Sequence, residues 1–195
     1  MKIKTAPKKG KVVVELESRD EGLLKPLSFE LQRILVPVDF SDTAKKALQY
    51  AVPFANAFDA EVLLVHVVQP YTVPAEFGYM PPELPVSQQE YENSAREELD
   101  KLRTREIGVG TRAQVQVRVG VPWQEIVAAA GEAKADLIIL STHGRTGLKH
   151  VVLGSVAEHV VRHAPCPVLV VRERERDFIP ISTKIETLSK TPEVK

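Results

Sequence analysis

From Arg33 onwards, short apolar runs alternate along the chain with segments in which apolar residues recur at helical spacing. Short runs rich in β-branched and aliphatic residues predict buried strands, because each run is too short to form a helix of its own. In residues 113–119, polar and apolar residues alternate instead, which also predicts a strand. The predicted strands are residues 34–38, 62–68, 113–119, 136–140 and 167–171.

Between these strands, apolar residues recur at the spacing of an amphipathic helix. Strands that are separated by helices need crossover connections, and crossovers produce a parallel sheet with helices on both faces. We therefore expect a doubly wound, Rossmann-like α/β fold with a five-stranded parallel sheet. Residues 70–86 contain several prolines and are expected to form a long loop. The predicted helices are residues 44–58, 91–102, 122–130 and 151–163.

The two ends of the chain lack this alternation. Residues 1–32 contain lysines and a short valine run at 12–14, and residues 173–195 mix charged residues with prolines. We therefore expect one domain at residues 33–172, which suits a chain of 195 residues. Residues 173–195 are expected to be a charged tail. The N-terminal extension is expected to be flexible, or to add a strand or hairpin to the sheet or to a neighbouring subunit.

Charge and cysteine content narrow the class of protein. The chain has 26 Lys and Arg residues against 26 Asp and Glu residues. This balance argues against a nucleic-acid or membrane-surface partner, because such proteins usually carry a basic excess. No apolar run approaches the roughly 20 residues that a membrane-spanning helix needs. The single cysteine, Cys166, excludes an intramolecular disulfide, so we expect a reducing compartment, the cytoplasm.

A glycine-containing stretch follows the fourth predicted strand. Residues 141–147 include Gly144, and Gly154 and Ser155 come shortly after them. Ligands of open α/β sheets bind at the carboxyl ends of strands, and glycine lets backbone N–H groups approach a phosphate. The same residues also have a purely structural interpretation: glycines suit turns, and Ser155 with Glu158 fits a capping box. Local sequence alone leaves both interpretations open.

Asp39 follows the first predicted strand directly. Its carboxylate could accept hydrogen bonds from ribose hydroxyls or hold a metal ion bridged to phosphate. Alternatively, it is an acid at a helix start, where Ser41 or Asp42 can cap the following helix without any ligand. The chain has no Gly-x-x-x-x-Gly-Lys-Ser/Thr motif and no Gly-x-Gly-x-x-Gly motif after the first strand. These absences argue against a Walker-type NTPase and a Rossmann dehydrogenase.

Other candidate residues carry weaker signals. His159 and His163 are one helical turn apart and could share a metal ion, but no further ligand at suitable spacing completes a site. Cys166 lies between two prolines with no signal for a lowered pKa, which favours a small buried residue over a nucleophile. Arg145 could pair with a phosphate or be a solvated loop residue. No catalytic triad is readable.

Several segments of the chain resemble universal stress proteins. Members of that family that bind ATP hold its phosphates with the pattern Gly-x2-Gly-x9-Gly-Ser/Thr, which Gly144, Gly154 and Ser155 match in spacing. The first glycine of the pattern is replaced by Ser141, which we interpret as tolerated, because serine is small and its hydroxyl can bond a phosphate or ribose. The resemblance spans residues 33–172 and is also carried by ILVPVDFS at 34–41, LVHV at 64–67 and APCPVLVV at 164–171.

This resemblance implies a nucleotide-binding domain at residues 33–172, with ATP or AMP as the ligand and magnesium as a candidate ion. The family commonly pairs its last strand, so the resemblance also implies a homodimer through Val168 to Val171, which would otherwise form an exposed apolar edge. The implied contacts are Pro37, Val38 and Asp39 with adenosine, Val67 with adenine, and Gly144, Arg145, Gly154, Ser155 and Val156 with phosphates. Leu140, Ser141 and His143 complete the predicted nucleotide-binding set.

Three functions follow from these observations. The first is a stress-response or signalling module in which an adenine nucleotide stabilises one conformation and changes partner binding. The second is a slow ATPase or phosphotransferase, in which Asp39 positions magnesium and His143 reaches the terminal phosphate; no dedicated base supports it. The third is a nucleotide-free dimeric interaction protein, in which Ser141 marks a degraded site and the proline-rich loop binds partners.

Overall fold

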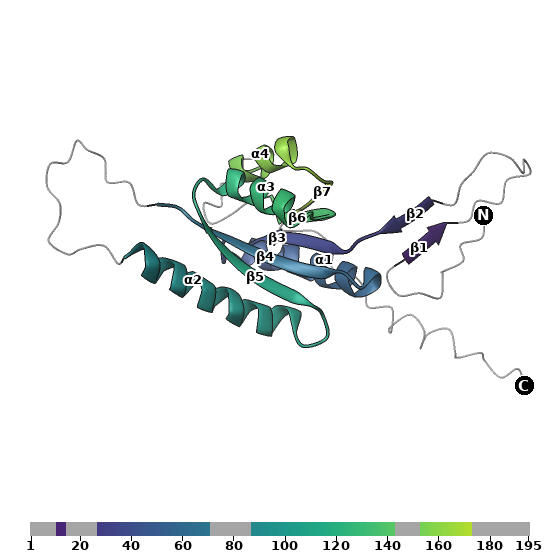
Figure 1. Cartoon of the computed structure of the whole chain (residues 1–195), viewed down its shortest axis with the longest axis horizontal. Helices are drawn as coiled ribbons and strands as arrows, with labels where there is room; N and C mark the ends of the chain where they lie inside the picture. The colour runs from purple at the N-terminus through teal and green to yellow at the C-terminus, as the bar shows by residue number, and fades with distance from the viewer. Residues whose placement is uncertain (1–10, 15–26, 71–86, 143–152, 173–195) are drawn as a thin grey trace, which may run out of the picture.

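The computed structural model describes residues 11–14, 27–70, 87–142 and 153–172 (Figure 1). The strands are β1 (Lys11–Val14), β2 (Leu27–Glu30), β3 (Arg33–Pro37), β4 (Glu61–Val68), β5 (Ala113–Val119), β6 (Leu137–Ser141) and β7 (Val168–Val171). The helices are α1 (Asp42–Phe58), α2 (Gln88–Leu102), α3 (Pro122–Glu132) and α4 (Ser155–His163), and a π-helical turn, Arg103–Ile107, continues α2. None of the described helices is long and apolar enough to cross a membrane.

The central sheet has five parallel strands in the order β5-β4-β3-β6-β7. The chain moves outwards from β3 to β5, returns to the middle, and then moves outwards in the other direction through β6 and β7. The strand order therefore reverses between β3 and β6. The predicted doubly wound fold is confirmed, and each predicted strand end lies within one residue of the observed end.

Two hydrophobic cores lie on opposite faces of the sheet, because successive side chains of a strand point to opposite faces. Ile34 and Val36 of β3 pack with α1 and α2, whereas Leu35 between them packs with α3 and α4. All three side chains are fully buried. Figure 1 shows α3 and α4 above the sheet and α2 below it. The strands are thus covered on both faces, as their nearly continuous apolar sequences predict.

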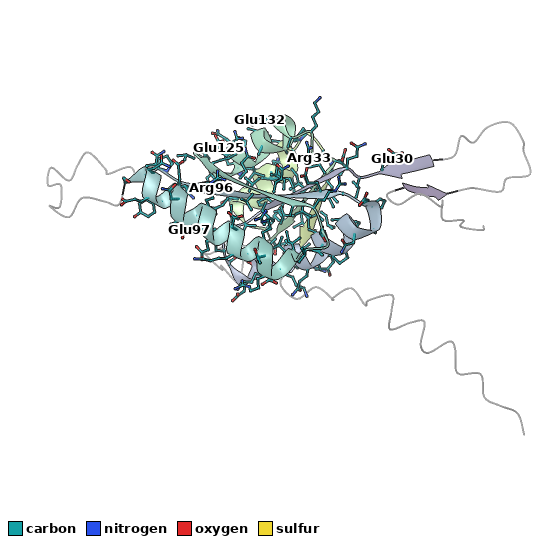
Figure 2. All side chains as sticks on the ribbon, turned by 60° about the horizontal axis from the view of Figure 1, so that its bottom comes forward. Glu30, Arg33, Arg96, Glu97, Glu125 and Glu132 are labelled. Atoms are coloured by element: carbon teal, nitrogen blue, oxygen red, sulfur yellow. The ribbon has the colours of Figure 1, made fainter. Side chains whose placement is uncertain are left out.

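Arg118 of β5 joins the sheet to α3. Its guanidinium donates from Nε to Glu125 at 2.7 Å and from Nη1 to Glu132 at 2.8 Å, and both acids lie on α3 (Figure 2). The Arg118 side chain is 17% exposed and that of Glu125 is 26% exposed, so the bond between them is partly shielded from water, whereas Glu132 is 62% exposed. They raise the pKa of Arg118 and lower the pKa of Glu132.

The prediction of a helix at residues 151–163 is wrong at its start. The helix begins at Ser155, and Gly154 is its N-cap with extended backbone angles, φ −66° and ψ 153°. The predicted capping box of Ser155 with Glu158 is also wrong, because Ser155 is already the first helical residue. The N–H of Glu158 donates to the carbonyl oxygen of Gly154, and its carboxylate accepts from Arg162 at 3.0 Å.

In the N-terminal extension, β1 and β2 pair with each other. They are antiparallel, with Lys11 opposite Glu30 and Val14 opposite Leu27. This pair forms a sheet of its own, and within the described residues it adds no strand to the five-stranded sheet. Figure 1 places it beyond the amino-terminal end of β3. The predicted tail, residues 173–195, lies outside the described residues.

Candidate ligand-binding site

A cavity of about 780 Å³ opens at the carboxyl ends of β3, β4 and β6. Residues of α2 line it from one face of the sheet, and residues of α3 and α4 line it from the other. Ligands of doubly wound sheets bind at this edge, beside the reversal in strand order. The predicted site residues in its lining are Pro37, Val38, Asp39, Val67, Leu140, Ser141, Gly154, Ser155 and Val156. His143, Gly144 and Arg145 lie outside the described residues.

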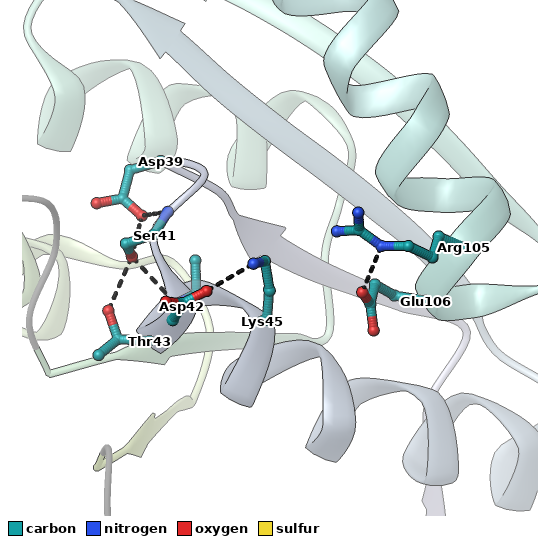
Figure 3. A network of polar contacts seen from close by, with 8 residues as sticks. Asp39, Ser41, Asp42, Thr43, Lys45, Arg105 and Glu106 are labelled. Carbon is teal, nitrogen blue, oxygen red and sulfur yellow. Dashed lines mark hydrogen bonds and ion pairs between the residues drawn. The ribbon is translucent and has the colours of Figure 1, made fainter.

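Asp39 is held at the cavity by the start of α1. Its Oδ1 accepts hydrogen bonds from the N–H of Ser41 at 3.1 Å and from the hydroxyl of Ser41 at 2.6 Å (Figure 3). The same hydroxyl caps α1 by accepting from the N–H of Ala44 at 3.2 Å. Of the two predicted caps, Ser41 is therefore the one observed. Asp39 serves the helix start and lines the cavity at the same time.

Phe40 has an unusual backbone conformation beside Asp39. Its φ is +63°, in the left-handed region that bulky residues rarely adopt. Its ring packs against the imidazole of His66, with ring centroids 4.5 Å apart. The Nδ1 of His66 lies 2.7 Å from the carbonyl oxygen of Val38 and must carry the hydrogen, since a carbonyl can only accept. His66 therefore supports the strained turn that places Val38 and Asp39 at the cavity.

A hydrogen bond joins the end of β6 to the start of α4. The N–H of Gly154 donates to the carbonyl oxygen of Thr142 at 2.8 Å. Thr142 itself is 5% exposed, and its N–H donates to the carbonyl oxygen of Val171 in β7. Ser141 and Gly154 therefore both lie at the cavity, although they are separated in the sequence.

The first turn of α4 lines the cavity and contains unpaired hydrogen-bond donors. The N–H groups of Ser155, Val156 and Ala157 and the hydroxyl of Ser155 have no hydrogen-bond partner within the described residues. All three residues line the cavity. Free N–H groups and the positive end of the helix dipole make such a turn suitable for an anion. The exposed Ser155 hydroxyl adds a donor at the same place.

Apolar side chains also line the cavity. Val38 and Leu140 are almost fully buried, and Val67 of β4 is half-buried. Its described lining includes the carboxylates of Asp39 and Glu98 but no lysine or arginine. Anion binding by the described residues would therefore depend on backbone N–H groups and hydroxyls.

α2 supplies one wall that the sequence analysis did not predict. Tyr91, Ser94 and Glu98 line the cavity, and their spacing of three and four residues places them on one face of the helix. Tyr91 is 49% exposed, although it is a large apolar residue. One feature of the sequence could have indicated this wall: Ser94 and Glu98 directly precede Ala95 and Leu99, which are buried residues of the same helix.

The described residues contain no group of three or more side chains able to hold a metal ion. His159 and His163 have nearly parallel rings with centroids 6.2 Å apart, and Trp123 packs against both at about 5 Å. Each Nδ1 contacts a backbone carbonyl one turn earlier. Parallel rings at this distance do not converge on one ion. Cys166 is half-buried, and burial raises the pKa of its thiol, which disfavours the nucleophilic thiolate.

Comparison with known proteins identifies the family. The model of the universal stress protein family matches residues 30–172. The chain belongs to this family. Universal stress protein MJ0531 of Methanocaldococcus jannaschii is 36% identical over 149 residues, which cover 75% of this chain and 85% of that protein.

Solved universal stress proteins share the fold of the chain. UspA from Lactobacillus plantarum has a TM-score of 0.59 and 32% identity, covering 73% of this chain and 98% of that one. A universal stress protein solved in complex with cAMP has a TM-score of 0.50 and 26% identity, covering 72% of this chain and 96% of that one.

Proposed function

We propose that this universal stress protein binds an adenine nucleotide, ATP or AMP, in the cavity at the carboxyl edge of the sheet. The observation that carries the proposal is the first turn of α4, where Gly154 bonds to Thr142 after β6 and three residues with unpaired N–H groups line the cavity. This arrangement suits a phosphate. The similarity to a universal stress protein solved with cAMP supports an adenine nucleotide as the ligand.

In this proposal the nucleotide crosses the cavity from α4 towards β3 and β4. The phosphates bind at Ser155 and Val156, and the apolar side chains of Val38 and Val67 contact the nucleoside. Asp39 accepts hydrogen bonds from ribose hydroxyls or holds a magnesium ion bridged to phosphate. The predicted loop residues His143, Gly144 and Arg145 complete the phosphate site.

The proposed role is a stress-response or signalling module of the cytoplasm. Nucleotide binding stabilises the folded state that binds it, and a change in occupancy can then alter the binding of a partner. The proposed assembly is a homodimer through β7, which lies at one edge of the sheet. Pairing this edge with a second copy would satisfy its outward N–H and C=O groups.

Calorimetry on the nucleotide-stripped full chain tests the proposal. ATP, AMP and cAMP are titrated with and without magnesium into wild type and Gly154→Val. The extended backbone of Gly154 accepts a valine, whose side chain is expected to block the phosphate. We expect wild type to bind at least one of these nucleotides and the variant to lose at least about tenfold in affinity, or ~1.4 kcal/mol.

Gly110→Val is the matched control for this experiment. An added Cβ at Gly110 meets no atom within 4 Å, and Gly110 does not line the cavity. The nucleotide affinity of Gly110→Val should therefore equal that of wild type. Failure of folded wild type to bind any of the nucleotides would refute the proposal and favour a nucleotide-free interaction protein. Phosphate release that Gly154→Val abolishes would add hydrolysis to the function.

A further inference from the structure

The wall of the cavity formed by α2 has a charge opposite to that of the α4 end. Glu98 lines the cavity from an exposed position two helical turns after Tyr91, with Ser94 between them. Its carboxylate has no hydrogen bond or ion pair within the described residues. The first turn of α4 on the other side presents partial positive charge from its N–H groups.

These two walls lie on opposite faces of the sheet. α2 packs with the core formed by Ile34 and Val36, whereas α4 packs with the core on the side of Leu35. A ligand that fills the cavity would therefore extend from the donors of α4 towards the carboxylate of Glu98. The described lining contains no lysine or arginine that could neutralise this carboxylate.

We infer that Glu98 sets the direction of the bound nucleotide and excludes nucleotides that carry a second phosphate on the nucleoside. The inference rests on the proposed function. A phosphate at α4 meets N–H donors, and hydroxyl or amino groups of the nucleoside that do not bind Asp39 can donate to the Glu98 carboxylate. A further phosphate near α2 would meet the like charge of the Glu98 carboxylate, and this repulsion would weaken binding. The preferred class is therefore nucleotides that carry no second phosphate group on the ribose.

Competition between related ligands tests this inference. AMP, adenosine 2′,5′-bisphosphate and adenosine 3′,5′-bisphosphate are titrated by calorimetry into the full chain. We expect wild type to bind AMP roughly 10-fold more tightly than at least one bisphosphate. Glu98→Gln should reduce that ratio to about threefold or less, because it removes the charge and keeps the shape. Glu98→Lys should favour the bisphosphate.

Glu97→Gln is the matched control. Glu97 lies on α2 (Figure 2), is exposed like its sequence neighbour Glu98, and does not line the cavity. The ratio of AMP affinity to bisphosphate affinity should be the same in Glu97→Gln as in wild type. If wild type binds AMP and both bisphosphates equally, the role of Glu98 is wrong while the proposed function stands. An equal effect of Glu97→Gln and Glu98→Gln would also overturn it. Binding of no nucleotide by wild type would refute the inference together with the proposed function.

Discussion

Ser155 combines three features at the first position of α4. Its N–H and hydroxyl have no partner within the described residues, and its position in the first turn places it at the positive end of the helix dipole. Gly154, not Ser155, occupies the N-cap position, and no side chain caps the helix. The side chain of Ser155 is therefore not needed to start the helix and can contact a ligand in the cavity.

Replacing Ser155 with aspartate should change helix stability and AMP affinity in opposite directions. Ser155→Asp places a negative charge in the first turn of α4, which should stabilise the helix by about 0.3–1 kcal/mol. The same charge should repel a phosphate and weaken AMP binding at least about tenfold. Asparagine has nearly the same shape as aspartate without the charge. The AMP affinity of Ser155→Asn should therefore stay within about threefold of the wild-type value. Calorimetry and urea unfolding check both effects, and equal AMP affinities for the two variants would count against a phosphate at α4.

At the scale of elements, the charge cluster of Arg118 helps to hold α3 against the sheet. Arg118 binds Glu125 and Glu132 at the two ends of α3, and its side chain is mostly buried. An exposed pair of the same chemistry, Arg162 with Glu158, lies within α4. Shielded charge-assisted bonds contribute more to stability than exposed ion pairs do, because water and salt screen the latter.

Arg118→Met should therefore destabilise the protein more than Arg162→Met. Methionine keeps the apolar stem and removes the guanidinium, so we expect a loss of about 1–2 kcal/mol in the free energy of unfolding for Arg118→Met. For Arg162→Met we expect less than about 0.5 kcal/mol. Urea denaturation measures both values. Equal losses would mean that the Arg118 cluster does not help to join α3 to the sheet.

The elements of the sheet could be predicted from the sequence because short apolar runs report burial directly. The start of α4 could not, since the apolar residues 151–153 continue the helical pattern beyond the true N-cap. The hydrogen bond from Gly154 to Thr142 fixes the extended backbone there, and local periodicity carries no information about such a tertiary contact. The α2 wall was missed for a similar reason, since only the fold brings Glu98 to the cavity.

At the scale of the whole molecule, the packed domain begins before the predicted boundary at residue 33. Leu31 is 3% exposed and belongs to the core on the face of α1 and α2. The N–H groups of Gln32 and Arg33 donate to the carboxylate of Asp136 at 2.7 and 2.8 Å. The family match, which begins at residue 30, agrees with this boundary.

Two truncations should therefore behave differently. A chain without residues 1–29 should be as stable as the full chain. A chain without residues 1–32 also lacks buried Leu31 and the bond to Asp136, so its free energy of unfolding should be lower by about 2–4 kcal/mol. Both should keep their AMP affinity while folded, because the cavity lies at the opposite edge of the sheet. Urea denaturation and calorimetry test these outcomes. A large loss of AMP affinity in the folded chain without residues 1–29 would contradict the placement of the nucleotide site at the opposite edge of the sheet.

Within the described residues β7 is the edge strand of the sheet, which allows a selective test of the proposed homodimer. The carbonyl oxygens of Pro167 and Val171 accept from residues at β6. The alternation of a parallel ladder then directs the N–H groups of Val168 and Val170 away from β6. Val170→Pro would remove one outward donor and leave the pairing with β6 intact. We expect it to convert a dimer into a folded monomer in analytical ultracentrifugation, with Val170→Ala still dimeric. A monomeric wild type would refute the dimer.

If the first turn of α4 binds the phosphate of an adenine nucleotide, its amides should respond to AMP. A titration of the ¹⁵N-labelled full chain with AMP, followed by NMR, measures this response residue by residue. We expect the amide signals of Ser155, Val156 and Ala157 to shift together and to saturate at the affinity found by calorimetry. Saturable shifts elsewhere, with these three amides unchanged, would show that the phosphate does not bind at α4.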